Sequence, residues 1–152
     1  MQDDNRIKAV ISDKAYPVPI EMRPLWRICL IVTSIAVVSG DKKYLDSKKV
    51  NILVWMLIRK KRWEEYEKYL LGRTNDIPLV SVDTATYKAV EFSIAKGFVL
   101  LKDGRVHLTD SGQVLHEILV KNEIMQDEMS FLHQVGKKLT GNKIKGLTGG
   151  LL

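Results

Sequence analysis

Cysteine is nearly absent from the sequence, which has only Cys29 among its 152 residues. A single thiol can form neither a disulfide nor a cysteine-based metal site within one chain, and this usage is typical of a reducing cytoplasm. The N-terminal residues are polar and mixed in charge, without the short apolar core and cleavage site of a signal peptide. The longest apolar stretch, residues 28–38, is far shorter than the ~20 residues of a membrane-spanning helix. We therefore expect a cytoplasmic protein that spans no membrane.

Motifs of catalysis are also missing from the sequence. Its three histidines, His107, His116 and His133, are far apart, and none has a metal-type spacing with another histidine, a cysteine or a carboxylate. There is no glycine-rich phosphate loop, no G-x-S-x-G and no cysteine–histidine nucleophile pattern. Paired carboxylates occur only in charged surroundings that favour simple solvation. The sequence predicts a protein that is not an enzyme and that needs no metal or cofactor.

The segment 82–119 carries the most information about fold. Its first part ends at Gly97, the residue expected just past a helix C-terminus. Before it, apolar residues recur near helical spacing at Ala85, Ala89, Phe92 and Ile94. Two short apolar runs then flank Asp103 and Gly104, and Asp-Gly between such runs is a strong signal for a two-residue β-hairpin turn. A helix followed by a hairpin is therefore predicted.

A further helix is predicted directly after this hairpin. Thr109 or Asp110 can cap it, because both side chains accept hydrogen bonds from free N–H groups of a first helical turn. Its expected apolar face consists of Val114, Leu115, Ile118 and Leu119. Helix, hairpin and helix in this order form the second half of a winged helix, and the segment resembles the end of the recognition helix, the wing and the LT-x-x-G signature of MarR-type proteins.

The remaining segments complete a mainly α protein with a small β-hairpin. Helices are predicted over 24–39, 47–62, 63–71 and 123–139, and residues 77–80 could supply the short first strand of a winged helix. We expect an extended arm over 1–21, one winged helix-turn-helix domain with N- and C-terminal helical extensions over 22–139, and a flexible glycine- and lysine-containing tail over 140–152.

The net charge of +6 is concentrated in residues 22–72. Candidate nucleic-acid contacts are the basic run Arg59, Lys60, Lys61 and Arg62, with Lys42, Lys43, Lys48 and Lys49 nearby in sequence, and Lys102 and Arg105 beside the hairpin turn. The alternative for the basic run is a solvated helix end, because cations also complement a helix C-terminus. The predicted recognition helix, 83–96, has no net charge, which is weak support for base reading.

The predicted first helix, 24–39, is apolar on nearly every side. Such a helix is either central to a core or part of an interface. We predict that Trp26, together with Tyr16, Pro17 and Pro19 of the arm, contributes to a partner interface, either with another protein or in a homodimer. The alternative is that Trp26 belongs to the core.

Three features together resemble a known family. They are R-P-L-W-R at residues 23–27, Trp55 in the second helix, and LT-x-x-G at residues 108–112. The chain is similar to the small middle components of bacterial ABC three-component defence systems, which include Lamassu-type antiphage systems. The resemblance implies a winged-helix subunit without catalytic residues that works beside an SMC/Rad50-like ATPase and an effector, often a nuclease.

Two functions of different classes follow. The first is a non-enzymatic adaptor that bridges an SMC-like ATPase and an effector nuclease in an antiphage complex, with nonspecific DNA contact at most. The alternative is a MarR-like transcriptional regulator that binds operator DNA as a dimer. The neutral charge of helix 83–96 favours the adaptor.

Overall fold

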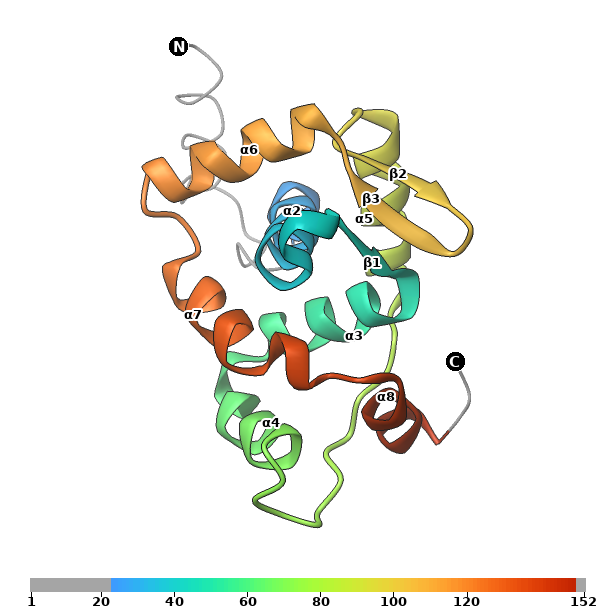
Figure 1. Ribbon diagram of the computed structural model, residues 1–152, viewed down its shortest axis with the longest axis vertical. Helices are drawn as coiled ribbons and strands as arrows, with labels where there is room; N and C mark the ends of the chain where they lie inside the picture. Colours follow the sequence, from blue (N-terminus) through green and yellow to red (C-terminus); the bar gives the residue numbers. More distant parts are fainter. Residues whose placement is uncertain (1–22, 150–152) are drawn as a thin grey trace.

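The computed structural model describes residues 23–149, which form seven α-helices and a small three-stranded antiparallel sheet (Figure 1). The helices are α2 (Pro24–Ser39), α3 (Ser47–Ile58), α4 (Trp63–Leu70), α5 (Thr84–Ala95), α6 (Asp110–Lys121), α7 (Gln126–Val135) and α8 (Gly141–Thr148). The strands are β1 (Tyr44–Asp46), β2 (Val99–Lys102) and β3 (Arg105–Leu108). The expectation of a mainly helical protein with a hairpin is thus confirmed, whereas the predicted arm, including Tyr16, Pro17 and Pro19, lies outside the described residues.

Helix α2 is the centre of the molecule. In Figure 1 it is viewed nearly end-on, with α6, α5, α3 and α7 arranged around it, and it contacts all four of these helices. Its residues from Arg27 to Ile35 are all buried. By length and composition, Pro24–Lys42 could cross a membrane. However, its apolar sides are covered by the chain's own helices, so packing within the fold accounts for its composition. Because the chain's own helices bury α2, its apolar composition is no longer an argument for a partner interface.

The sheet brings the first helical half of the chain to the hairpin. Its strand order is β1-β3-β2, and β3 pairs with both neighbours in the antiparallel sense. Val106 of the central strand β3 lies between Leu45 of β1 and Leu101 of β2. Asp103 and Gly104 both have positive φ, 53° and 73°, as the Asp-Gly pattern predicted. The predicted two-residue turn is therefore confirmed.

The first strand and the tail differ from the expectations. The short strand is Tyr44–Asp46 between α2 and α3, whereas residues 77–80 form no strand, and Ile77 and Leu79 are exposed. The expected flexible tail contains the helix α8, which the Thr140 side chain caps by accepting a hydrogen bond from the Lys143 N–H. This helix is anchored by buried Leu147 and by Lys143 Nζ, which donates to the Tyr69 carbonyl at 3.3 Å.

The buried faces of α5 and α6 also differ from the sequence interpretation. In α5 the buried residues are small or β-branched, namely Thr86, Ala89, Val90 and Ser93. Phe92 and Ile94, which the apolar spacing placed inward, are exposed, as is Val114 in α6. The physical reason is that α5 packs directly on α2, and close helix contact favours small side chains. The Ser93 hydroxyl is buried without cost there, because it donates to the Ala89 carbonyl at 2.7 Å.

Candidate interaction surfaces

The described part of the chain contains no group of three or more histidine, cysteine, aspartate or glutamate side chains that could hold a metal ion. Cys29 is fully buried in α2, and burial raises the pKa of its thiol to about 12. The thiol therefore stays protonated and is no nucleophile at neutral pH. Burial lowers the pKa of His116, with Glu117 opposing this effect. We find no arrangement for acid–base or nucleophilic chemistry in residues 23–149.

Arg59, the first residue of the predicted basic run, is held by the fold. Its guanidinium lies over the Trp55 ring at 3.2 Å from the ring centroid, and its Nη1 donates to the Trp55 carbonyl at 3.0 Å. Burial lowers its pKa, although Tyr66 and Asp83 nearby oppose this shift. Arg59 thus covers an aromatic ring and is poorly placed to bind phosphate as well.

The rest of the basic run is also largely occupied. Lys60 Nζ lies 3.2 Å from Glu128 of α7, whose side chain is only 4% exposed, and 3.7 Å from the exposed Asp127. Arg62 approaches Glu65 on the next turn at 3.9 Å. Lys61 is exposed and has no carboxylate within ion-pair distance among the residues described. Three of the four cations thus face acidic or aromatic groups, which leaves them less available to phosphates and also differs from the solvated helix end given as the alternative.

The lysines at the start of α3 are close in sequence to the basic run 59–62 but lie at the opposite end of the helix. Lys48 and Lys49 lie in the first turn of α3, whereas Arg59 follows its last residue, and a 12-residue helix is about 18 Å long. Ser47 at the start of α3 donates its N–H to the Gly104 carbonyl at 2.9 Å, which ties this helix end to the hairpin turn. Lys48 and Lys49 therefore belong with the hairpin.

Lys102 and Arg105 flank the hairpin turn, as expected. They are opposite one another in the β2–β3 register, and both are exposed. The Arg105 guanidinium lies 4.9 Å from the centroid of the Tyr44 ring in β1, so it is oriented along the sheet. Unlike Lys60, these two cations have no carboxylate within ion-pair distance among the residues described.

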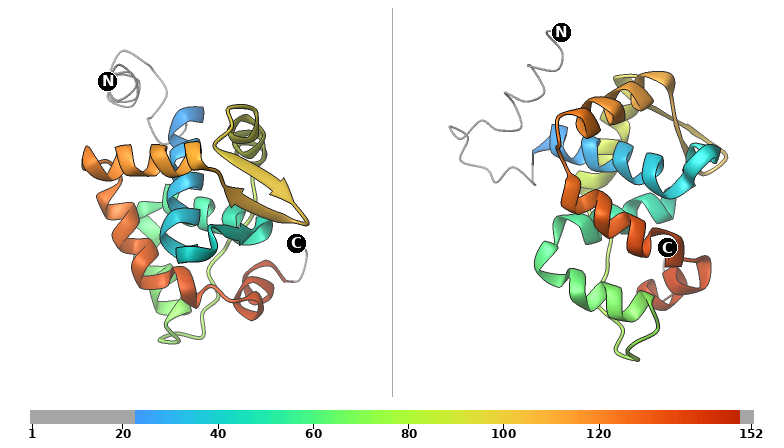
Figure 2. Two further views of the ribbon diagram at one scale, coloured as in Figure 1. Left: turned by 45° about the horizontal axis from the view of Figure 1, so that its top comes forward. Right: turned by 60° about the vertical axis from the view of Figure 1, so that its left-hand side comes forward.

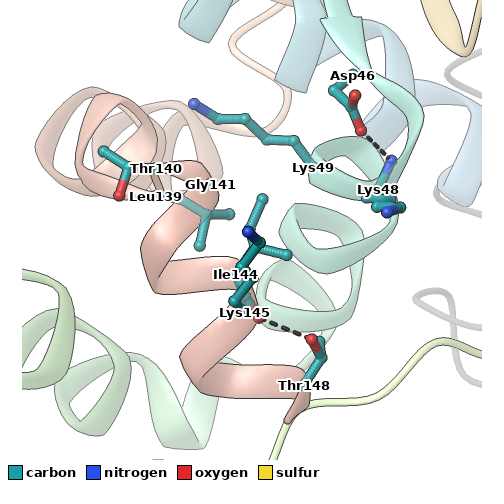
Figure 3. Close-up of a pocket in the computed structure, with 9 residues that line it drawn as sticks. All are labelled: Asp46, Lys48, Lys49, Leu139, Thr140, Gly141, Ile144, Lys145 and Thr148. Atoms are coloured by element: carbon teal, nitrogen blue, oxygen red, sulfur yellow. Dashed lines mark hydrogen bonds between the residues drawn. The ribbon is translucent and has the colours of Figure 1, made fainter. Parts of the chain in front are cut away.

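A pocket between α3 and α8 adds a feature that the sequence did not predict (Figure 3). Its volume is about 390 Å³, and its lining includes Asp46, Lys48 and Lys49 from the start of α3 and Gly141 and Lys145 from α8. The sequence could not bring these residues together, because α8 lies in the segment expected to be flexible. Their meeting depends on the contacts that hold α8 against Tyr69 of α4.

The interface prediction for Trp26 receives no support from exposure alone, because this side chain is half-buried and packs against the core. A different surface exposes large apolar groups. Helix α5 presents Tyr87, Phe92 and Ile94, which are 47%, 50% and 38% exposed, and the neighbouring edge strand β2 presents Leu100 and Leu101. We call the exposed surface of these two neighbouring elements the α5–β2 face. Its residues do not form one flat patch, because Phe92 and Ile94 lie on different sides of α5, and Leu100 and Leu101 point to opposite sides of the sheet.

No family model, curated protein or solved structure matches the chain.

Proposed function

We propose that the protein is a non-enzymatic adaptor subunit with a winged-helix fold that binds an SMC/Rad50-like ATPase and links it to an effector nuclease in a bacterial antiphage complex. The observation that carries the proposal is the α5–β2 face. It exposes large apolar side chains at the position where a DNA-reading protein of this fold would present polar and basic ones.

The order of elements supports the winged-helix assignment. Helix, strand and helix in α2, β1 and α3 are followed by the helix α5 and the hairpin β2–β3, and β1 pairs with β3 at the inner position of the sheet. The chain departs from a minimal winged helix in one respect. Residues 59–83, including α4, lie between the second and third helices, where a helix-turn-helix has only a short turn.

Within this assignment, α5 is the recognition helix. Its exposed side includes Lys88 and Glu91, which cancel in charge, beside the aromatic rings of Tyr87 and Phe92. Phosphate neutralisation supplies most nonspecific DNA affinity, so a neutral helix gains little there. Aromatic side chains are enriched in the cores of protein–protein interfaces, where their burial contributes most of the binding free energy. The face therefore favours a protein partner.

The identity of the partner rests on the resemblance to the middle components. The residues that carry the resemblance have structural positions here: Arg27 binds Asp83, Trp55 lies beneath Arg59, and Thr109 caps α6 by accepting from the Gly112 N–H at 3.1 Å. These positions are consistent with the proposed winged-helix fold, and the resemblance is the reason to expect the same kind of partner.

Co-purification with an SMC/Rad50-like ATPase from the native host tests the proposal. We expect Phe92→Glu to abolish the association, because it buries a charge in the contact, while Val120→Glu on α6 does not. Val120 is the matched control, since it is 51% exposed and Phe92 is 50% exposed. A tight, sequence-selective DNA footprint at physiological salt without ATPase association would contradict the adaptor and favour the MarR-like regulator.

A further inference from the structure

Three lysines meet at the pocket between α3 and α8. Lys48 and Lys49 come from the first turn of α3, and Lys145 comes from α8, some 100 residues along the chain. The pocket contains one carboxylate, Asp46, so the charge of its lining is positive. Figure 3 shows the Lys49 side chain extending from α3 towards the side of the pocket where Leu139 and Thr140 lie, just before α8.

These lysines are not neutralised within the described fold. Asp46 is used as the cap of α3, where its Oδ1 accepts from the backbone N–H of Lys48 at 2.9 Å. No carboxylate of residues 23–149 lies within ion-pair distance of the three ammonium groups. Burial lowers the pKa of half-buried Lys49, as expected for a cation that lacks a counter-charge. An anion in the pocket would supply that charge.

The N-terminus of α8 lies at the same pocket, because Thr140 and Gly141 both line it. The Thr140 hydroxyl accepts from the Lys143 N–H, which leaves the N–H groups of Gly141 and Asn142 without a partner within the helix. A Cβ added at Gly141 would meet no atom within 4 Å, so the backbone here is open to a ligand. Free N–H groups beside ammonium groups are a favourable environment for phosphate oxygens.

Two basic residues of the hairpin lie next to the pocket, with Asp46 and Asp103 near them. The hydrogen bond from Ser47 N–H to the Gly104 carbonyl places the start of α3 against the turn, which Lys102 and Arg105 flank. The hairpin, the start of α3 and α8 follow one another along the right-hand side of Figure 1, and the left view of Figure 2 has the same order. The lysines of the pocket and the cations of the hairpin together cover more than a single phosphate would contact. They therefore suit a ligand that has several phosphates in a row.

We propose that this pocket is a phosphate-binding site that takes a backbone phosphate of a nucleic acid, with the hairpin cations contacting neighbouring phosphates. Binding is independent of base sequence, because lysines and backbone N–H groups contact phosphates without reading base edges. The site is independent of the α5–β2 face and of the proposed ATPase partner. It also differs from the basic run 59–62, in which three of the four cations face aromatic or acidic groups.

Fluorescence anisotropy with a short labelled DNA duplex, measured over a series of salt concentrations, tests the site. We expect Lys49→Ala/Lys145→Ala to weaken binding about tenfold and to reduce the salt slope by about 2, one for each lost phosphate contact. The control Lys61→Ala/Lys121→Ala has the same loss of charge at exposed positions away from the pocket, and should change affinity less than twofold.

Two further arms complete the design. If Lys49→Ala/Lys145→Ala loses its circular dichroism spectrum, Lys48→Ala/Lys145→Ala, which removes two exposed lysines, replaces it. Pyrophosphate, tested by calorimetry, separates the sources of phosphate. Binding of pyrophosphate without duplex binding overturns the nucleic-acid ligand. Equal affinities of the pocket variant and the control overturn the site, as does wild-type protein that binds no duplex at low salt.

Discussion

At the N-terminal ends of α2 and α5, one arginine and one aspartate join two helices. Arg27 Nη1 lies 3.3 Å from Asp83 Oδ2 and donates to Thr86 Oγ1 at 3.0 Å, while Asp83 caps α5 by accepting from the Thr86 N–H at 2.7 Å. Arg27 is buried, so removing its carboxylate would leave a cation in the core. The ion pair of Arg27 and Asp83, two residues that are far apart in sequence, thus fixes the position of α5 relative to α2.

We expect Asp83→Ala to lower the free energy of unfolding by about 2–4 kcal/mol, because it removes both a helix cap and the partner of a buried cation. Chemical denaturation measures this loss. Glu91→Ala, on the exposed side of the same helix, is the control and should change stability by less than about 0.5 kcal/mol. Equal effects of the two substitutions would contradict the role of Asp83.

The same aspartate predicts a pH dependence. Burial raises the pKa of Asp83, but the hydrogen bonds from Thr86 and the charge of Arg27 outweigh this, so its pKa lies below the ordinary value. A carboxyl with a depressed pKa in the folded state stabilises the protein above its unfolded pKa of about 4, and this stability is lost as the pH falls through the folded value. Denaturation of Asp83→Asn at several pH values should show a weaker loss of stability below about pH 4 than wild type.

Lys60 is the second residue whose partner determines its role. Its contact with buried Glu128 joins the end of α3 to α7. We expect Lys60→Ala to destabilise the fold by about 1–3 kcal/mol, since it leaves a buried carboxylate unpaired, and Lys60→Ala/Glu128→Gln to recover part of the loss. Lys61→Ala, next in the same basic run, is the control for thermal unfolding. Identical melting of both single variants would show that the run is solvated throughout.

Among the elements, those with strong local signals were predicted best. The predicted bounds of α2, 24–39, match the structure, as does the Asp-Gly turn, because a proline at the helix start and a turn with positive φ are encoded by neighbouring residues. Strand β1 has only three residues and owes its conformation to pairing with β3, so no alternation is visible in its sequence. Helix α8 lies in a glycine-rich segment of low helix propensity, and its contacts with Tyr69 come from a distant part of the chain.

The candidate surfaces were harder to predict for a related reason. The basic run was visible as a cluster in sequence, but its contacts with Trp55 and Glu128 depend on tertiary packing. The α5–β2 face was missed because apolar spacing was taken to mark the buried side. In α5 the buried side instead carries small residues such as Ala89 and Ser93, which allow close contact with α2.

The junction between the hairpin and α6 tests the packing of these elements. A Cβ at Gly112 would collide with the Phe98 carbonyl oxygen and would lie 2.6 Å from Leu108 Cδ1. We expect Gly112→Ala to reduce the free energy of unfolding by about 1–3 kcal/mol, because a backbone atom cannot move aside without distorting the hairpin. Gly141→Ala, where a Cβ meets nothing within 4 Å, is the control and should leave stability unchanged or slightly higher. A stable Gly112→Ala protein would show that α6 can shift freely.

At the scale of the molecule, the lysine-lined pocket and the exposed aromatic residues lie on different elements, although strand β2 carries both Leu101 and Lys102. Among the described residues, basic side chains gather at the two ends of α3. Those beside the hairpin and α8 have no carboxylate within ion-pair distance, whereas most of those at the other end face acidic or aromatic groups. The exposed aromatic residues lie on α5 and the apolar ones continue on the edge strand β2. This separation is what we expect of a subunit that binds a protein by one surface and a polyanion by another.

Site-specific photocrosslinking tests the central claim, that α5 and β2 bind the ATPase, most directly. A photoreactive phenylalanine analogue replaces Phe92 in one protein and Val120 in another, two positions of nearly equal exposure. In the assembled complex, we predict a crosslink to the ATPase from position 92 and none from position 120. A complex that assembles fully but gives crosslinks only from position 120, or from neither position, would contradict the account.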